Sequence, residues 1–324
     1  MRPVKTVALA GLLCACAPSP DAATESRLLA ARDRHDTAAL RTHGWELWQR
    51  LATHWQDLVP ADRVLGHSDR MFRPLRPFRD GTVTETETLP VMFSVAFDPS
   101  AAAHIRDHAL ASRAALGKLA TFPAFPRSAI AVKLVWYPIH RDRVARIPIW
   151  DGEVIAGRNP DRTWRRTVAI DPAQFITRTL TTDAELAAAR TIAHDPTLAR
   201  GDLAVLLGMH VATKETPDWV WATFWWHDRA DTGPYAAGRP ALPGPAGHYL
   251  MDVAYSGDGS CMNPWLEARF PDGVHSNCLT CHQRAAFGAT DYLPVTHGTL
   301  RADDPYFAGK LPTDFVWTLA LEAR

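Results

Sequence analysis

The segment from Asn277 to His282 constrains this chain more than any other part of the sequence. It contains two cysteines three positions apart with a histidine directly after the second, which is the Cys-x-x-Cys-His pattern of covalent haem attachment. The thiols of Cys278 and Cys281 can each add to one vinyl group of a haem, and His282 is then placed to bind the iron from the proximal side. We therefore predict one covalently bound haem c.

Two other kinds of site use closely spaced cysteines. A thioredoxin-like redox pair has the Cys-x-x-Cys spacing but has no use for the histidine that follows. A structural zinc site needs two further ligands at similar spacing, and the sequence contains no second Cys-x-x-Cys. Haem attachment is the interpretation that uses all three residues.

The position of the motif argues against the commonest fold of c-type cytochromes. In that all-helical fold the motif lies near the N-terminus, and a methionine far downstream is the second axial ligand. Here only 42 residues follow His282, and the last methionine, Met262, precedes the motif. Met262 and Met251 are candidate sixth ligands, but the fold must be a different one.

Residues 1–16 have the layout of an export signal. A short basic start is followed by an apolar run over residues 6–13 and by small residues before the expected cleavage site. The apolar run is far shorter than the ~20 residues needed to span a bilayer. Leu13-Cys14-Ala15-Cys16 resembles a bacterial lipobox in which Cys16 is lipidated, and an ordinary secretory signal is the alternative. Either interpretation places the folded chain in the periplasm, and Ala17 favours anchoring to the outer membrane.

The net charge and the number of cysteines limit the kinds of molecule that this protein is expected to bind. The 35 basic and 35 acidic residues give a formal net charge of zero at pH 7, which gives no support to nucleic-acid binding. After one cysteine is removed with the signal, one is lipidated and two hold haem, Cys261 remains alone, so a disulfide framework is excluded. Such a cysteine is most often a small buried apolar residue. The expected partners are a small-molecule ligand, a redox protein and, through the anchor, a membrane.

The N-terminal part of the chain is predicted from composition and periodicity. Residues 17–36 are small and polar and are expected to form a tether. Apolar residues and tryptophans then recur at helical spacing over residues 40–55, which predicts an amphipathic helix. Prolines and arginines make residues 60–90 an irregular wrap. A strand over 91–97 follows, then an Asp-Pro turn and a helix over 100–120 with Ser100 as N-cap.

The rest of the chain is rich in predicted strands. One helix is expected over residues 183–193, and strands are expected over residues 129–137, 144–150, 163–170, 203–213, 219–227 and 249–255. This order favours an α+β fold with an antiparallel sheet and helices on one side of it. We expect a single domain over residues 37–324, with a helical wrap over 37–90 and a β-rich core over 91–324.

Several short segments occur in an order that is typical of one family. They are residues 95–99 with 103–104, 125–133, 207–210 with 218–221, 278–283 and 313–318. In this order they resemble a strand with an Asp-Pro turn and helix, a Val-Lys strand, two more strands, a haem site and a closing strand. The chain thus resembles the cytochrome P-460 and cytochrome c′-beta family of β-sheet c-type cytochromes. Residues 37–90, 138–165 and 228–275 would be insertions.

This resemblance implies roles for individual residues. It implies redox chemistry on hydroxylamine, as in cytochrome P-460, or binding of small gases, as in cytochrome c′-beta. It makes His282 the proximal ligand, and it puts Lys133 at the position of a lysine that is cross-linked to the haem. Leu134 stands where the family has an acidic residue, which departs from the cross-linking pattern. His210 stands where hydroxylamine-oxidising members have a distal carboxylate.

The residues themselves leave alternatives open. Lys133 lies in an apolar run, and a buried ammonium needs a partner. It therefore either approaches the haem or belongs to an edge strand, where it reaches water or a carboxylate. His210 is either a distal residue, acting as base, hydrogen-bond donor or iron ligand, or a satisfied core histidine. His227 and Asp228 form a pair that can orient an imidazole, although such pairs are common at strand ends.

The sequence therefore predicts a periplasmic monohaem c-type cytochrome lipoprotein. Its expected function is electron transfer or redox chemistry on hydroxylamine, nitric oxide or peroxide at an open haem iron, with His210 and Lys133 as candidate catalytic residues. One alternative is an electron carrier with a six-coordinate iron. Another is a structural or sensory haem protein that acts through a protein partner.

Overall fold

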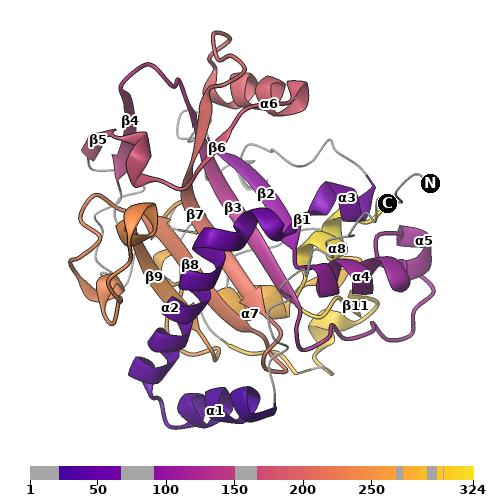
Figure 1. Ribbon diagram of the computed structural model, residues 1–324. Coiled ribbons are helices and arrows are strands. Elements are labelled where there is room, and N and C mark those ends of the chain that lie inside the picture. The colour runs from indigo at the N-terminus through magenta and orange to yellow at the C-terminus, as the bar shows by residue number, and fades with distance from the viewer. Residues whose placement is uncertain (1–21, 67–90, 150–165, 268–272, 290–297, 302) are drawn as a thin grey trace, which may run out of the picture.

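The computed structural model of the protein describes residues 22–324 apart from residues 67–90, 150–165, 268–272, 290–297 and 302 (Figure 1). The predicted export signal and Cys16 lie outside the described residues, as does most of the predicted wrap over residues 60–90. The first residues of the predicted wrap are described, and they belong to β1 (Val59–Pro60) and to the short helix α3 (Ala61–Leu65). No helix among the described residues is both long and apolar enough to cross a membrane.

A seven-stranded antiparallel sheet occupies the centre of the molecule (Figure 1). Next to β1 come, in spatial order, β2 (Met92–Phe97), β3 (Ile130–Ile139), β7 (Leu203–Thr213), β8 (Val220–Trp226) and β9 (Tyr249–Ala254), and β6 (Thr177–Thr179) also pairs with β7. Five of these strands, β2, β3, β7, β8 and β9, are apolar runs predicted from the sequence, whereas the short strands β1 and β6 were not predicted. The α+β class is confirmed.

Two further strand pairs in the described part of the chain lie outside this sheet. In the first, β4 (Ala145–Ile149) pairs with β5 (Arg166–Ile170), so the strands predicted over residues 144–150 and 163–170 pair with each other. In the second, β10 (Ala286–Phe287), which follows the Cys-x-x-Cys-His motif, pairs with β11 (Leu311–Pro312). Periodicity predicted the strands of the first pair but not their separation from the main sheet.

The predicted tryptophan-rich helix is α2 (Thr37–His54), which covers one face of the sheet. The ring of Trp48 stacks on Phe224 of β8 with ring centroids 4.6 Å apart. Gly44 permits this close approach, because a Cβ there would come within 2.7 Å of Val253 on β9. Buried aromatic side chains of this size dominate the energetics of a core, at roughly 25 cal/mol for each Å² of apolar surface removed from water.

The tether predicted over residues 17–36 is wrong for the residues that the structure describes. Residues Ala22–Asp33 form the helix α1, in which Leu28 and Ala31 are buried. The carboxylate of Asp36 then caps α2 by accepting the backbone N–H of Ala39. The apolar face of α1 contains few residues, and the residues around it are polar, so the sequence shows no clear helical periodicity here.

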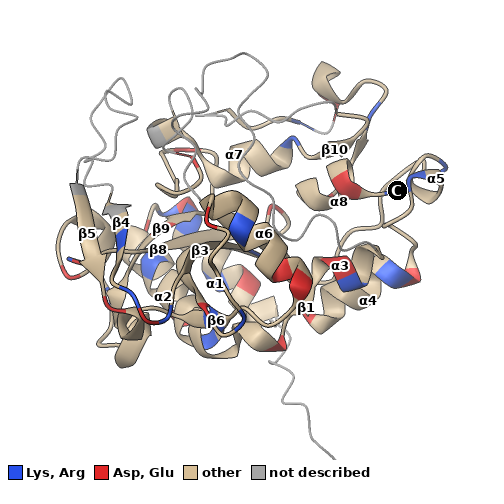
Figure 2. Ribbon diagram, turned by 90° about the horizontal axis from the view of Figure 1, so that it is seen from above, with Lys and Arg blue, Asp and Glu red and all other residues tan. Residues whose placement is uncertain are grey.

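The Cys-x-x-Cys-His motif lies on the opposite face of the sheet from α2 (Figure 2). It forms α7 (Cys278–Gln283), and α8 (Trp317–Glu322) lies on the same side. The helix predicted over residues 183–193 is present as α6 (Asp183–Ala193). Helices therefore flank both faces of the sheet, and the prediction that they lie on one side is wrong.

The helix predicted over residues 100–120 is two shorter helices, α4 (Pro99–Asp107) and α5 (Arg113–Leu116). Ala109 between them has a left-handed backbone with φ of 52°. The N-cap is Asp98 and not Ser100, because the carboxylate of Asp98 accepts the backbone N–H groups of Ser100 and Ala101. Proline at the first helical position suits this start, since it has no N–H to leave unpaired.

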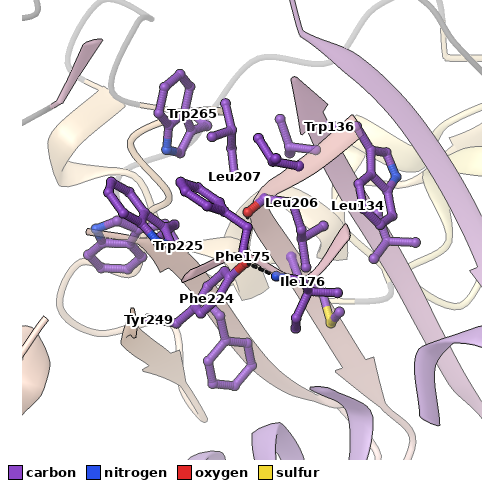
Figure 3. Close-up of a cluster of buried hydrophobic side chains, with 14 of the residues drawn as sticks. Leu134, Trp136, Phe175, Ile176, Leu206, Leu207, Phe224, Trp225, Tyr249 and Trp265 are labelled. Carbon is purple, nitrogen blue, oxygen red and sulfur yellow. Dashed lines mark hydrogen bonds between the residues drawn. The ribbon is translucent and has the colours of Figure 1, made fainter. Parts of the chain in front are cut away.

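Apolar cores pack against both faces of the sheet. The larger core includes Trp136, Phe224 and the residues drawn in Figure 3. Within it the hydroxyl of Tyr249 donates to the carbonyl oxygen of Leu206 at 2.8 Å, so its polar atom is satisfied. A second core includes Trp221 of β8, Leu279 of α7 and Val316, and it also contains Cys278 of the motif.

Candidate functional site

The helix α7 places both motif thiols on one face. Residues three positions apart on a helix are neighbours, so Cys278 and Cys281 lie one above the other. Asn277 is the N-cap, since its side-chain oxygen accepts the backbone N–H of Thr280 at 3.1 Å. The amide nitrogen of the same side chain donates to the carbonyl oxygen of Gly259 at 3.0 Å, which ties the start of α7 to the preceding loop.

The ring of His282 is held in one tautomer. Its Nδ1 lies 2.9 Å from the carbonyl oxygen of Phe315, and a carbonyl only accepts, so Nδ1 carries the proton. Burial lowers the pKa of His282 to about 4, so the ring is neutral near pH 7 and Nε2 keeps its lone pair. Among the described residues no group is hydrogen-bonded to Nε2. A metal-binding histidine has this arrangement, with the far ring N–H fixed by a second group.

The His282 ring packs on the sheet through Trp221 of β8, with ring centroids 4.2 Å apart. Side chains alternate along a strand, so Thr223 faces the same side as Trp221. His210 of β7 is opposite Thr223, and Lys133 of β3 is opposite His210. The two candidate catalytic residues therefore lie on the sheet face that carries α7.

The charges of these residues act on His282. After burial, which has the largest effect, the charges of His210 and Lys133 lower the pKa of His282, while the carboxylate of Glu267 opposes them. The structure thus places His210 and Lys133 on the same side of the sheet as the motif.

Glu267 is a site residue that the sequence analysis missed. Its Oε1 lies 3.0 Å from Nε2 of His210, and its Oε2 accepts the backbone N–H of Asn263 at 2.7 Å. Burial alone would raise the pKa of Glu267, but His210, the Asn263 hydrogen bond and Lys133 together lower it. An ionised carboxylate only accepts hydrogen bonds, so Nε2 of His210 donates and Nδ1 is left to exchange a proton with a ligand.

Asn263 fixes the segment that carries Glu267. Its amide nitrogen donates to the hydroxyl of Thr223 and to the carbonyl oxygen of Phe224, each at 2.9 Å. This contact crosses directly over Gly208 of β7, where a Cβ would lie 2.9 Å from the Asn263 amide nitrogen. Gly208 is therefore needed for the close approach of the two segments.

Lys133 does not lie on an edge strand, so that part of the alternative is wrong. β3 is paired on both sides, with β2 and with β7. The half-buried side chain places Nζ 4.8 Å from the centre of the Phe93 ring, a cation–π contact. Its charge also lowers the pKa of Glu267, so the carboxylate expected near a buried lysine is present.

Cys261 is buried, as predicted, but it also contacts the motif. Its Sγ lies 3.3 Å from Sγ of Cys278, and the Cys278 thiol reaches the Cys261 carbonyl oxygen at 3.2 Å. Burial raises the pKa of the Cys261 thiol well above its ordinary value, so it is uncharged. The described residues contain no group of three or more His, Cys, Asp or Glu arranged to hold a metal ion, so the zinc alternative gains no support.

Two other candidates lie elsewhere. Met251 pairs with Phe224 on the face covered by α2, where its sulfur lies near Gly44, so its prediction as a sixth ligand is wrong. Nδ1 of His227 accepts the backbone N–H of Arg229 at 2.9 Å, which makes it part of the turn after β8. That turn is at the opposite end of β8 from the residue that meets the motif.

Met262 is buried and directly follows Cys261, and it stays a candidate sixth ligand. The set of donor atoms in the motif fits a covalent haem. It comprises two thiols on one turn of helix and a neutral imidazole with Nε2 available, set beside an apolar core.

In comparisons with known proteins, no family model, no curated protein and no solved structure matches this chain.

Proposed function

We propose that the chain is a monohaem c-type cytochrome of the cytochrome P-460 and cytochrome c′-beta type, held to a periplasmic membrane surface by lipidated Cys16. Cys278 and Cys281 would hold the haem, and His282 would bind its iron through Nε2. The observation that carries this proposal is the Nδ1–H of His282 on the Phe315 carbonyl, beside two thiols on the same helix. A haem bound there supplies an iron that exchanges single electrons and binds small ligands.

His210 and Glu267 support redox chemistry on a small nitrogen or oxygen compound such as hydroxylamine, nitric oxide or peroxide. A carboxylate that accepts from one ring nitrogen orients the imidazole and raises its basicity, as in catalytic and metal-binding histidines. His210 can then take a proton from such a compound, which contributes roughly 10²- to 10⁴-fold where proton transfer limits the rate. Lys133 adds positive charge on the same side of the sheet.

A second function is favoured by Met262. This buried methionine directly follows Cys261, and the sulfur of Cys261 lies 3.3 Å from that of Cys278 in the motif. With Met262 as sixth ligand the protein would be an electron carrier without an open iron position. A haem with a structural or sensory role, read out by a protein partner, stays the third possibility.

The first experiment tests covalent haem. Cys278→Ala with Cys281→Ala should remove all haem stain from the exported protein on a denaturing gel. Cys261→Ala is the matched control, because it also removes a buried thiol at the site, and it should keep the stain. A wild-type chain that is exported without stain, or a double variant that keeps it, would contradict the proposal.

The second experiment separates the enzyme from the carrier. Optical spectra of the ferrous protein with and without carbon monoxide should show ready binding if the iron position is open. His210→Ala should then change ligand affinity or turnover of hydroxylamine without loss of haem, whereas His227→Ala should not. Ligand binding that appears only in Met262→Ala would instead identify the electron carrier.

A further inference from the structure

The carbonyl group that fixes His282 belongs to an unusual turn. Asp314 has φ of 45° and Phe315 has φ of 70°, so both lie in the left-handed region. For residues other than glycine such a conformation is strained and persists only when the surroundings impose it. A bulky residue such as Phe315 is particularly disfavoured there. The strand predicted over residues 313–318 is wrong for this reason, since the chain turns and then enters α8.

Lys214 holds this turn from the end of β7. Its buried ammonium group donates to Oδ1 of Asp314 and, at 2.8 Å, to the carbonyl oxygen of Pro217. It also lies 5.4 Å from the Trp219 ring and 5.8 Å from the Phe315 ring, close enough for cation–π attraction. One lysine therefore contacts both left-handed residues of the turn.

Asp314 is fixed on its other side as well. Its Oδ2 accepts the backbone N–H of Phe125 at 2.8 Å, and Oδ1 lies 3.3 Å from Nε1 of Trp219. The carboxylate thus joins Lys214, the loop before β3 and the start of β8 around a single turn. These contacts supply the constraint that a strained turn requires.

Stability alone does not account for the pair. Taking two charges out of water costs several kcal/mol, and apolar residues of similar volume often replace a buried ion pair without loss of stability. What this pair specifies is a conformation, because the turn it holds directs the Phe315 carbonyl toward Nδ1 of His282.

We propose that Lys214 and Asp314 are positioning residues for His282. Their ion pair holds the turn so that the Phe315 carbonyl accepts the Nδ1 proton, and Nε2 keeps its lone pair for a metal. The inference rests on the proposed function only for the identity of the group that Nε2 binds. The tautomer of His282 itself does not depend on that function.

Four variants of the full chain test the inference. Lys214→Met removes one charge and leaves the Asp314 carboxylate unpaired, so it should also destabilise the fold. Lys214→Met combined with Asp314→Asn leaves no unpaired charge, and asparagine tolerates the left-handed region better than most residues. Lys214→Arg keeps the charge. Lys310→Met is the matched control, because this lysine bonds to the Tyr306 carbonyl and not to the turn.

The main measurement is the ¹⁵N NMR shift of His282 in haem-free full-length protein, produced without export and labelled with [¹⁵N]histidine. The signal is assigned by its absence in His282→Ala. Wild type and Lys310→Met should show one tautomer, protonated at Nδ1. The double variant should unfold near the wild-type temperature yet show both tautomers in comparable amounts, and Lys214→Arg should restore most of the single tautomer. In haem-loaded protein the double variant should raise the reduction potential, because a weaker Nδ1 hydrogen bond makes His282 a poorer electron donor, whereas Lys310→Met should leave the potential unchanged.

A single Nδ1-protonated tautomer in every variant that folds, together with an unchanged potential, would overturn the positioning role. If the wild-type chain carries no haem but its tautomer responds as described, the proposed function fails and the positioning role stands. If the exported wild-type chain carries haem but the tautomer of the haem-free chain is the same in every variant, the proposed function stands and the positioning role fails. The two proposals therefore fail in distinguishable ways.

Discussion

Gly208→Ala tests how the sheet is joined to the segment that carries Glu267. The added Cβ would lie 2.9 Å and 3.1 Å from the Asn263 amide nitrogen and oxygen, and 3.2 Å from the Phe224 carbonyl oxygen. The carbonyl belongs to the paired strand β8 and cannot move far, so the Asn263 side chain must leave. It would give up its bonds to Thr223 and Phe224 and the bond that it accepts from the backbone N–H of Trp265.

The magnitude follows from these three bonds. Each contributes a net ~0.5–1.5 kcal/mol, and an alanine in a strand regains about 0.5–1 kcal/mol over glycine. We expect a loss of about 2–3 kcal/mol in the free energy of unfolding, or a fall in Tm of roughly 5–10 °C for a domain of this size. Glu267 should shift with Asn263, so ligand binding at the site should change as well.

Urea denaturation of a double-mutant cycle provides the assay. Asn263→Ala makes room for the new Cβ, so Gly208→Ala should cost much less in that background, and the two effects should be far from additive. Gly117→Ala is the control, because Gly117 has φ of −64° and its nearest contact would be the Arg113 carbonyl oxygen at 3.3 Å. Additive effects, or a Gly208→Ala chain as stable as Gly117→Ala, would refute the reasoning.

Three further predictions concern stability and location. Burial raises the pKa of Asp252 from 3.8 to about 7, so the folded state binds more protons than the unfolded state between those values, and stability falls as pH rises through this window. Asp252→Asn should flatten that dependence in urea midpoints measured at pH 5 and pH 8, and an unchanged slope would count against it. Trp48→Ala should lower the free energy of unfolding by about 3–5 kcal/mol in the same assay, because it empties the contact between α2 and β8. Cys16→Ser should move the protein from the membrane fraction to the soluble periplasm or block its processing, and an unmodified N-terminus beyond residue 16 in wild type would exclude lipidation.

The main strands were predictable because their signal is local. Residues 203–213, for example, form one apolar run, and β7 occupies the same positions in the middle of the sheet. The break between α4 and α5 was not predictable in this way, because alanine at position 109 gives no sign of a left-handed backbone. Nor does periodicity distinguish β4 and β5, which pair with each other, from strands of the main sheet.

The site was predictable only where its residues form a motif or match a family pattern. Cys278, Cys281 and His282 lie within five consecutive positions, so the motif can be recognised without knowledge of the fold. Glu267 is a single acidic residue that meets His210 across 57 positions, and nothing near it in the sequence marks that contact. Asp314 likewise has its turn imposed from 100 positions away. Such long-range contacts appear only after the sheet is assembled.

The early start of α1 sets how far the folded domain can stand from a membrane. This helix begins at Ala22, only six positions after Cys16. Even a fully extended chain covers at most ~3.6 Å per residue, so a lipid on Cys16 would keep the first helix within about 20 Å of the bilayer surface. A domain held at the surface in this way would move mainly along the membrane, where it would meet partners bound to the same membrane more often than a freely diffusing domain would.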